Sequence, residues 1–286
     1  MRTRVAAMRR VEAGAELKAR REEQGLTLRE VAYRIDYNPG MLSMWERGLR
    51  TMDTWEAALY LGACVTPMRE ALRIISLVQP PSDLYWVRPY FDRLEDPVKS
   101  VIIQENLAKT MICYNPDYIP GLHQTEDYAR IVFGYQPHHS PEEVNFLVNA
   151  RLDRQKLLQR PKPPHCVFFI HEDALRKVVG HPQTTYDQLQ YLLLSASLPH
   201  CSIRVVPEAS PAGRARRFPF RIMEFPEPRP AMAYAEIDTA NLFIEDRPAV
   251  ETYYALVTQL EQSALDEGQS RDWLIRLADE YERMKE

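Results

Sequence analysis

The stretch TLREVAYRIDYNPGMLSMWERGLR, residues 27–50, decides the fold of the first part of the chain. Apolar residues in its first half recur at the i, i+3, i+4 and i+7 positions of one helical face, namely Leu28, Val31, Ala32 and Ile35. Asn38 and Pro39 then indicate a second helix start, because asparagine caps helices and proline suits the first helical position. The stretch predicts two short helices joined by a tight turn, an arrangement that can lay the second helix across the major groove of DNA.

The residues at the expected helix ends agree with this interpretation. Gly25 follows a helix expected over residues 11–24, at a position that favours a left-handed residue. Thr27 can cap the next helix, with Glu30 as its partner in a capping box. Residues 53–64 and 67–78 have the pattern of two further helices. The first part of the chain is therefore expected to be an all-α domain of five helices.

The second helix of the pair offers few side chains for strong base contacts. It has no arginine to bind guanine and no glutamine to read adenine, so direct readout is expected from Asn38, Ser43 and methionine contacts with thymine methyls. Arginines beside the two helices, and the N–H groups at the helix starts, are expected to bind phosphates, although each arginine alone could be a solvated surface charge. The predicted DNA-binding residues are Thr27, Arg29, Arg34, Asn38, Pro39, Gly40, Met41, Ser43, Met44, Arg47 and Arg50.

The composition is that of an ordinary globular protein of 286 residues with a net charge of −4. Residues 1–78 hold 13 basic and 10 acidic residues, and the remainder holds 23 and 30. This small basic excess favours nucleic-acid contact at the N-terminal part only. Four scattered cysteines predict neither a zinc site nor a disulfide framework, and no cofactor is expected. No apolar run approaches the ~18 residues of a membrane span, so a cytoplasmic protein is expected.

The sequence QPPS at residues 79–82 predicts a linker between a first domain, residues 1–78, and a second, residues 83–286, because consecutive prolines cannot continue a helix. The second domain is expected to be α+β with a mainly antiparallel sheet. Helices are expected over residues 83–94, 125–133, 141–159, 174–179, 186–197, 248–265 and 271–284. Strands are expected over residues 98–103, 107–114, 167–170, 203–206, 220–225, 231–237 and 241–244, the last three as a meander.

Two resemblances add to these patterns. The sequence LSMWERG at residues 42–48 resembles the end of the third helix of phage-repressor or XRE-type helix-turn-helix domains. The sequence YIPGLHQTEDYAR at residues 118–130 is similar to the PGLLQT-x-x-YA signature of a large actinobacterial regulator family, with His123 in place of an apolar residue. Further motifs of that family follow in order: Arg151-x-x-Arg154-Gln155, Glu172-x-x-Leu175, Gln188-Leu189 and IRVVP at residues 203–207.

The resemblance implies a WhiJ-like or antitoxin-like transcriptional regulator whose C-terminal domain has no assigned function. Such regulators are commonly encoded beside a small partner protein. We expect the C-terminal domain to control the regulator by receiving such a protein or by binding a small-molecule effector.

Polar residues of the second domain could form a structural network or a ligand pocket. Thr125 can cap the helix that follows it, with Glu126 in the first turn. Glu172 is expected to cap the helix at residues 174–179, and His171 to end a strand. A catalytic or metal site there is not supported, because the chain has no HExxH or GxSxG motif. The candidate ligand or partner residues are His123, Gln124, Thr125, Tyr128, Arg151, Arg154, Gln155, His171 and Glu172.

Two polar segments are expected to be exposed loops, namely His138-His139 and the basic run at residues 213–217. The basic run could instead bind an anionic ligand, the acidic face of a partner or additional DNA phosphate.

The sequence thus predicts a two-domain regulator that binds double-stranded DNA and is not an enzyme. A homodimer is expected, because such domains gain affinity by presenting two recognition helices to a palindrome. The alternative is a DNA-independent enzyme or adaptor that keeps the helical domain as a scaffold. Candidate dimer residues, which could equally belong to the core, are Tyr253, Leu256, Leu260, Trp273, Leu274 and Leu277.

Overall fold

The structure is a computed structural model that describes residues 2–78, 85–89, 95–137, 139–215, 217–237 and 239–284. The chain divides into two compact units, Met1–Ser82 and Asp83–Glu286. The segment expected to be the linker, residues 79–82, lies outside the described residues.

The first unit is all helical, as predicted. Its apolar core is built around Leu17 of the first helix, Leu42 and Trp45 of the third and Tyr60 of the fourth, all fully buried. Gly25 has a φ of 65°, in the left-handed region expected for it after the first helix. The helices are α1 (Arg2–Glu23), α2 (Leu28–Ile35), α3 (Pro39–Glu46), α4 (Thr54–Ala63) and α5 (Met68–Val78).

The second unit contains a seven-stranded mixed sheet in the order β1-β7-β6-β5-β2-β3-β4. Four of the neighbouring pairs are antiparallel, and the pairs β2–β3 and β3–β4 are parallel. The predicted meander is confirmed as β5-β6-β7. The strands are β1 (Tyr85–Pro89), β2 (Thr110–Asn115), β3 (His165–His171), β4 (Cys201–Val206), β5 (Phe220–Glu224), β6 (Met232–Ile237) and β7 (Ala240–Ile244).

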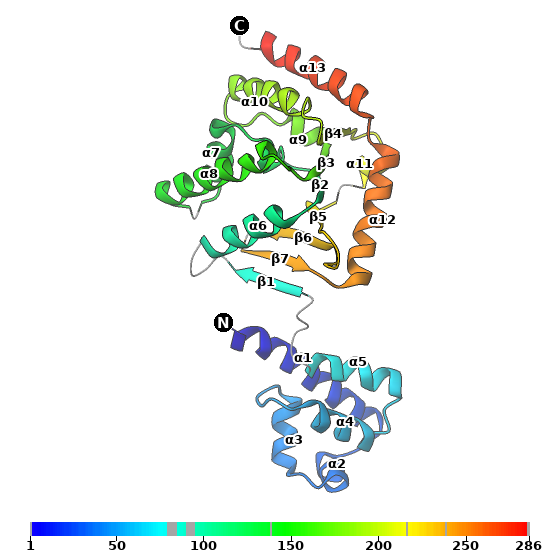
Figure 1. Cartoon of the computed structure of the whole chain (residues 1–286). Coiled ribbons are helices and arrows are strands. Elements are labelled where there is room, and N and C mark those ends of the chain that lie inside the picture. The colour runs from blue at the N-terminus through cyan, green and yellow to red at the C-terminus, as the bar shows by residue number, and fades with distance from the viewer. Residues whose placement is uncertain are drawn as a thin grey trace. The chain divides into compact units, whose positions relative to one another are not determined.

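Helices cover both faces of this sheet, which makes three layers (Figure 1). On one face, α12 packs on β5 and β6; on the other, α10 and α13 pack together and α13 lies on β4. The helices are α6 (Glu95–Leu107), α7 (Glu126–Gly134), α8 (Pro141–Gln155), α9 (Glu172–Arg176), α10 (Pro182–Ser195), α11 (Pro211–Arg214), α12 (Arg247–Ser263) and α13 (Glu267–Arg283).

The alternation of side chains along the strands explains why helices cover both faces of the sheet. Met111 and Cys113 of β2 pack into the core on the α10–α13 face, whereas Tyr114 packs into the core on the α12 face. In β3, Phe168 and Phe169 divide in the same way. Because successive side chains of a strand point to opposite faces, strands that are apolar at every position must be buried on both.

Two predicted elements are wrong. Within the helix expected at residues 83–94, the described segment Tyr85–Pro89 is strand β1, which pairs with β7 at the edge of the sheet. Proline is tolerated on an edge strand, and aromatic and β-branched residues favour one. The strand expected at residues 98–103 lies inside α6, where Val98, Val101 and Ile102 have the i, i+3, i+4 spacing of a helix.

The candidate dimer residues on the last two helices belong to the core. Leu260, Leu274 and Leu277 are buried, and Tyr253, Leu256 and Trp273 are partly buried against the same core clusters. The predicted basic loop is also partly wrong, because Gly213 and Arg214 end the short helix α11; Arg216 lies outside the described residues. His139 is partly buried rather than exposed, and its neighbour His138 is not described.

Candidate functional site

The turn between α2 and α3 is fixed by local hydrogen bonds. Thr27 and Glu30 form the complete capping box at the start of α2, with the Glu30 carboxylate accepting from the Thr27 N–H at 2.7 Å. Asp36 ends α2 in the left-handed region, at a φ of 56°. Asn38 caps α3 through its Oδ1, which accepts from the Gly40 N–H at 2.7 Å. The point where α3 begins is therefore fixed by residues close to it in the sequence.

The predicted DNA-binding residues on and beside these helices differ in exposure. Met41, Ser43 and Met44 are partly buried, and Met41 packs against the domain core. Arg34 donates to the Ala63 carbonyl at the end of α4 at 2.6 Å, and Arg47 donates from Nε to the Ser43 carbonyl at 3.1 Å. Those that are exposed to solvent are Thr27, Arg29, Arg34, Asn38, Pro39, Gly40, Arg47 and Arg50.

A buried ion pair links α3 to α1, and the sequence patterns did not predict it. The Arg21 guanidinium donates to both carboxylate oxygens of Glu46, at 2.7 and 3.0 Å, and its third contact is the Leu26 carbonyl at 2.9 Å. The Tyr60 hydroxyl donates to the same carboxylate. Burial, and then the Glu46 carboxylate, raise the pKa of Tyr60 above its ordinary value. One closed network thus joins α1, α3 and α4.

Close packing holds α3 against α1 as well. A Cβ at Gly14 of α1 would lie 2.4 Å from the Trp45 carbonyl oxygen, far inside van der Waals contact. The backbones of the two helices can approach this closely only at glycine.

In the second unit, three glutamine side chains hold the loop of residues 118–125. Gln124 donates to the Ile119 carbonyl at 2.7 Å, and Gln155 of α8 donates to the Gln124 carbonyl at 2.6 Å. Gln188 of α10 accepts from the Thr125 N–H at 2.7 Å and donates to the His123 carbonyl at 2.6 Å. These contacts satisfy buried backbone groups, so this part of the predicted cluster is structural.

The remaining residues of that loop also have structural contacts. Thr125 caps α7 by accepting from the Tyr128 N–H, and the Tyr128 hydroxyl accepts from the Ile119 N–H at 3.4 Å. His123 is fully buried, with its ring edge-on to Phe168 at 4.4 Å. Neither ring nitrogen of His123 has a hydrogen-bond partner among the described residues. Burial, and then repulsion from His200, lower its pKa to about 4, so it is neutral at physiological pH.

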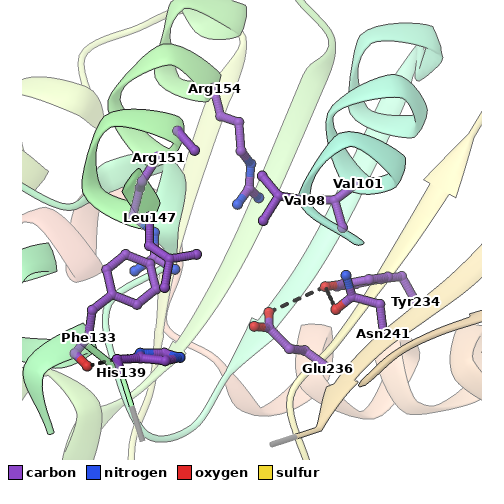
Figure 2. A pocket seen from close by; sticks show the side chains of 11 residues that line it. Val98, Val101, Phe133, His139, Leu147, Arg151, Arg154, Tyr234, Glu236 and Asn241 are labelled. Atoms are coloured by element: carbon purple, nitrogen blue, oxygen red, sulfur yellow. Dashed lines mark hydrogen bonds between the residues drawn. The ribbon is translucent and has the colours of Figure 1, made fainter. Parts of the chain in front are cut away.

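A cavity of about 470 Å³ lies at one end of three neighbouring central strands, where β2 and β6 end and β5 begins. Its floor is a row of paired residues on three strands, Cys113, Arg221 and Tyr234. Residues of α7, α8 and the loop after β2 form its walls, among them Gln124, Arg151 and Arg154. A smaller pocket of about 70 Å³ shares several of these residues; Figure 2 shows Arg151 and Arg154 of α8 facing it, with Tyr234, Glu236 and Asn241 on the other side.

Arginines dominate the polar groups around the cavity. Glu105 of α6, which is buried, accepts from Arg154 at 2.6 and 2.9 Å and from Arg221. Burial alone would raise the pKa of Glu105, but the two guanidinium groups outweigh it and hold the pKa below its ordinary value. Arg151 differs, because it donates to the neutral Gln124 Oε1, at 2.5 Å, and its guanidinium lies 4.0 Å from the Phe133 ring centre.

Glu105 and Arg221 were not among the predicted site residues. A signal existed for each. Arg221 stands between the apolar residues Phe220 and Ile222 of β5, which places a charge on a covered face of the sheet. Glu105 lies at i+7 from Val98 and therefore on the same face of α6, the helix whose residues 98–103 were expected to form a strand.

His171 and Glu172 lie elsewhere and line neither cavity. The prediction that Glu172 caps the next helix is wrong: His171 is the cap, with its Nδ1 accepting from the Asp173 N–H at 3.1 Å and its Nε2 3.3 Å from the Gly213 carbonyl oxygen. Glu172 instead pairs with Arg176 at 2.7 Å and accepts from the Glu208 N–H at 3.1 Å. The imidazole caps because it is buried beside the first free N–H of the turn.

Neither a metal site nor a membrane span is apparent in the part of the chain that the structure describes. Its histidine, cysteine and acidic side chains form no group of three or more that could hold a metal ion. Nor does any described helix combine the length and apolarity needed to cross a bilayer.

Comparisons with known proteins match both units. A model described as a helix-turn-helix domain matches residues 12–65, and one described as a domain of unknown function (DUF5753) matches residues 98–276. Among solved structures, the clp gene regulator ClgR from C. glutamicum is 28% identical over 26% of this chain and 96% of that chain, with a TM-score of 0.23. No curated protein matches the chain. The helix-turn-helix match supports a DNA-binding regulator.

Proposed function

The chain belongs to the family defined by that domain of unknown function, here joined to a helix-turn-helix domain, and we propose that it is a sequence-specific transcriptional regulator controlled through its C-terminal unit. The observation that carries the proposal is α3 itself. It is capped by Asn38 and held by the Arg21–Glu46 pair, and the exposed residues Arg29 and Arg50 precede and follow it in the chain. These features suit a helix that enters the major groove between two phosphate contacts.

We assign control of DNA binding to the C-terminal unit because that unit holds a cavity large enough for a ligand. Small-molecule sites commonly occupy about 300–1,000 Å³, and they favour the ends of strands where the sheet changes direction. The cavity of about 470 Å³ beside β2 fits both criteria, since β2 is parallel to one neighbour and antiparallel to the other. A small-molecule effector is therefore preferred to a partner protein, and no catalytic role is assigned.

Binding of the full chain to DNA fragments selected from a random pool tests the DNA-binding role. Replacing Arg29, Arg47 and Arg50 with alanine should lower affinity for all fragments and reduce the slope of log K against log salt by about three units, since about one unit is lost per phosphate contact. The matched control replaces three exposed basic residues outside α2 and α3, namely Lys18, Arg69 and Arg276. Equal loss in both variants would contradict the proposal.

Base reading by Asn38 requires a variant that keeps the cap. Asn38→Ser retains an oxygen for the Gly40 N–H but removes the amide donor, so it separates capping from recognition. We expect a loss of about 1–3 kcal/mol in discrimination between operator and random DNA, with an unchanged melting temperature. Unchanged discrimination would remove Asn38 from the base-reading set.

We also propose that the protein binds its operator as a homodimer. A single helix-turn-helix buries modest surface, and two of them spaced one turn apart read a palindrome. Sedimentation of the full chain with operator DNA should give two chains per duplex. One chain per duplex would contradict the dimer and leave the other parts of the proposal standing.

A further inference from the structure

The cavity beside β2 has more positive than negative charge around it. Four basic side chains line it, Arg151, Arg154, Arg221 and Lys177, against two acidic ones, Asp117 and Glu236. Glu105, buried behind Arg154 and Arg221, neutralises one more positive charge. One positive charge is left over among the described residues around the cavity.

That extra charge is best assigned to Arg151. The carboxylate of Glu105 is occupied by Arg154 and Arg221, whereas the hydrogen bond that the structure gives Arg151 goes to a neutral amide. Burial, and then the nearby Arg154, lower the pKa of Arg151 to about 10, although the carboxylate of Glu236 acts in the opposite direction. A partly buried cation that makes no ion pair with a carboxylate costs folding free energy, and a bound anion would offset that cost.

Two of these arginines also have an N–H donor without an acceptor among the described residues. The Nε–H groups of Arg151 and of Arg221 are shielded from solvent, and no described residue accepts from either. A guanidinium offers its donors as a planar fork that matches two oxygens of a carboxylate or phosphate. Two arginines with open donors beside one cavity suit a ligand that carries such oxygens.

The rest of the lining suits an apolar body. Phe133 and Tyr118 stand at the walls, each already under a cation: Arg151 lies 4.0 Å from the first ring centre and Lys177 lies 4.2 Å from the second. Phe220 and Val132 add apolar surface. Rings that are partnered with cations can stack on a flat ligand whose charged group reaches the same cations.

We propose that this cavity binds a small organic anion, with its carboxylate or phosphate against Arg151 and Arg221 and its flat apolar body between Phe133 and Tyr118. As an effector site the inference rests on the proposed function, but as an anion site it stands on the cavity alone. Arg151 is then the specificity-determining residue, since the other two arginines that line the cavity, Arg154 and Arg221, are already paired with Glu105.

Calorimetric titration of the full chain without DNA tests the anion site. The probes are benzoate, phenyl phosphate, inorganic phosphate and the neutral isostere benzamide. We expect benzoate or phenyl phosphate to bind at least tenfold more tightly than benzamide, and inorganic phosphate to bind more weakly than phenyl phosphate because it lacks the apolar body. The better of the two aryl anions shows whether the natural group is a carboxylate or a phosphate.

The variant Arg151→Met separates binding from folding. It should weaken binding of the aryl anion at least tenfold and raise the melting temperature of the free protein, because an uncompensated charge is removed. The control Arg130→Met, on the exposed face of α7 where Arg130 pairs with Glu126 at 2.8 Å, should leave anion binding unchanged.

Three results would overturn the inference: no aryl anion binds the wild-type chain, benzamide binds as tightly as benzoate, or Arg151→Met binds the anion with wild-type affinity. DNA binding is measured separately on the same preparations. Anion binding without DNA binding would end the regulatory proposal but keep the site, and the reverse result would end the site alone.

Discussion

The two units of the chain each bury charged side chains, but they do so in different ways. In the helical unit, Arg21 and Tyr60 both donate to the buried Glu46 carboxylate, and both Glu46 oxygens are used. In the sheet unit, Arg154 and Arg221 share the buried Glu105 carboxylate, and a third arginine beside them, Arg151, has a neutral acceptor. The first arrangement is complete in itself, whereas the second lacks a negative charge.

The difference shows which buried charges stabilise the fold and which are available to a ligand. A closed pair such as Arg21–Glu46 leaves nothing unsatisfied, so it can hold α3 at a fixed angle without responding to a signal. The open arrangement beside the cavity changes its charge balance when an anion enters. A ligand can shift DNA affinity only by binding two states of the protein unequally, and about 1–3 kcal/mol of such a difference is enough for a switch.

The largest effect is expected from Glu105→Gln, which removes the one carboxylate shared by Arg154 and Arg221. Breaking a buried pair by removing one partner costs about 3–5 kcal/mol, and here two guanidinium groups are left uncompensated. Urea unfolding should show the loss, and hydrogen exchange should locate it in the sheet unit. The control Glu126→Gln breaks an exposed pair and should cost under about 1 kcal/mol. Similar losses in both variants would remove the distinction between buried and surface pairs.

A smaller loss, of about 3 kcal/mol, is expected from Glu46→Gln, because only one arginine loses its carboxylate and Arg21 still donates to the Leu26 carbonyl. Hydrogen exchange should increase in α3, and DNA binding should weaken with it. Arg21 also pairs at 3.5 Å with the exposed Glu22, so Glu22→Gln is a matched control at the same arginine and should cost almost nothing. Full DNA affinity in Glu46→Gln would show that the Arg21–Glu46 pair does not position α3.

The sequence predicted the helical unit better than the sheet unit for a physical reason. The ends of α2 and α3 are fixed by residues within four positions of each other, such as Thr27 with Glu30 and Asn38 with Gly40, so local patterns suffice. The segment of β1 becomes a strand because β7, more than 150 residues later, supplies its hydrogen bonds. Tertiary pairing of this kind overrides local propensity.

The candidate cavity was predicted only in part for the same reason. Gln124, Arg151 and Arg154 were expected near one another from their motifs, and all three line the cavity. Arg221 and Glu105 come from a strand and a helix that meet only through the register of β5 with β2 and the packing of α6. The charge imbalance around Arg151 depends on both, so motifs alone could not reveal it.

The smallest effect at neutral pH is expected from His123→Leu, which tests whether an unpaired buried polar group away from the cavity is only a cost. His123 lines neither cavity, and both its ring nitrogens lack partners among the described residues, so leucine should stabilise the sheet unit by about 1 kcal/mol at pH 7.

The gain in stability from His123→Leu should grow on acidification, because the unfolded imidazole takes up a proton below about pH 6.5 and the folded one only below about pH 4. Between these values the unfolded wild type binds more protons than the folded form and loses stability as the pH falls. The difference approaches about 3 kcal/mol more at pH 4, at about 1.4 kcal/mol per pKa unit. Urea unfolding of both proteins from pH 7 to pH 4 measures it, with the exposed His165→Leu as the control. Parallel pH profiles for wild type and His123→Leu, or a destabilised leucine variant, would mean that His123 has a role of its own in the loop that Gln124 and Gln155 hold.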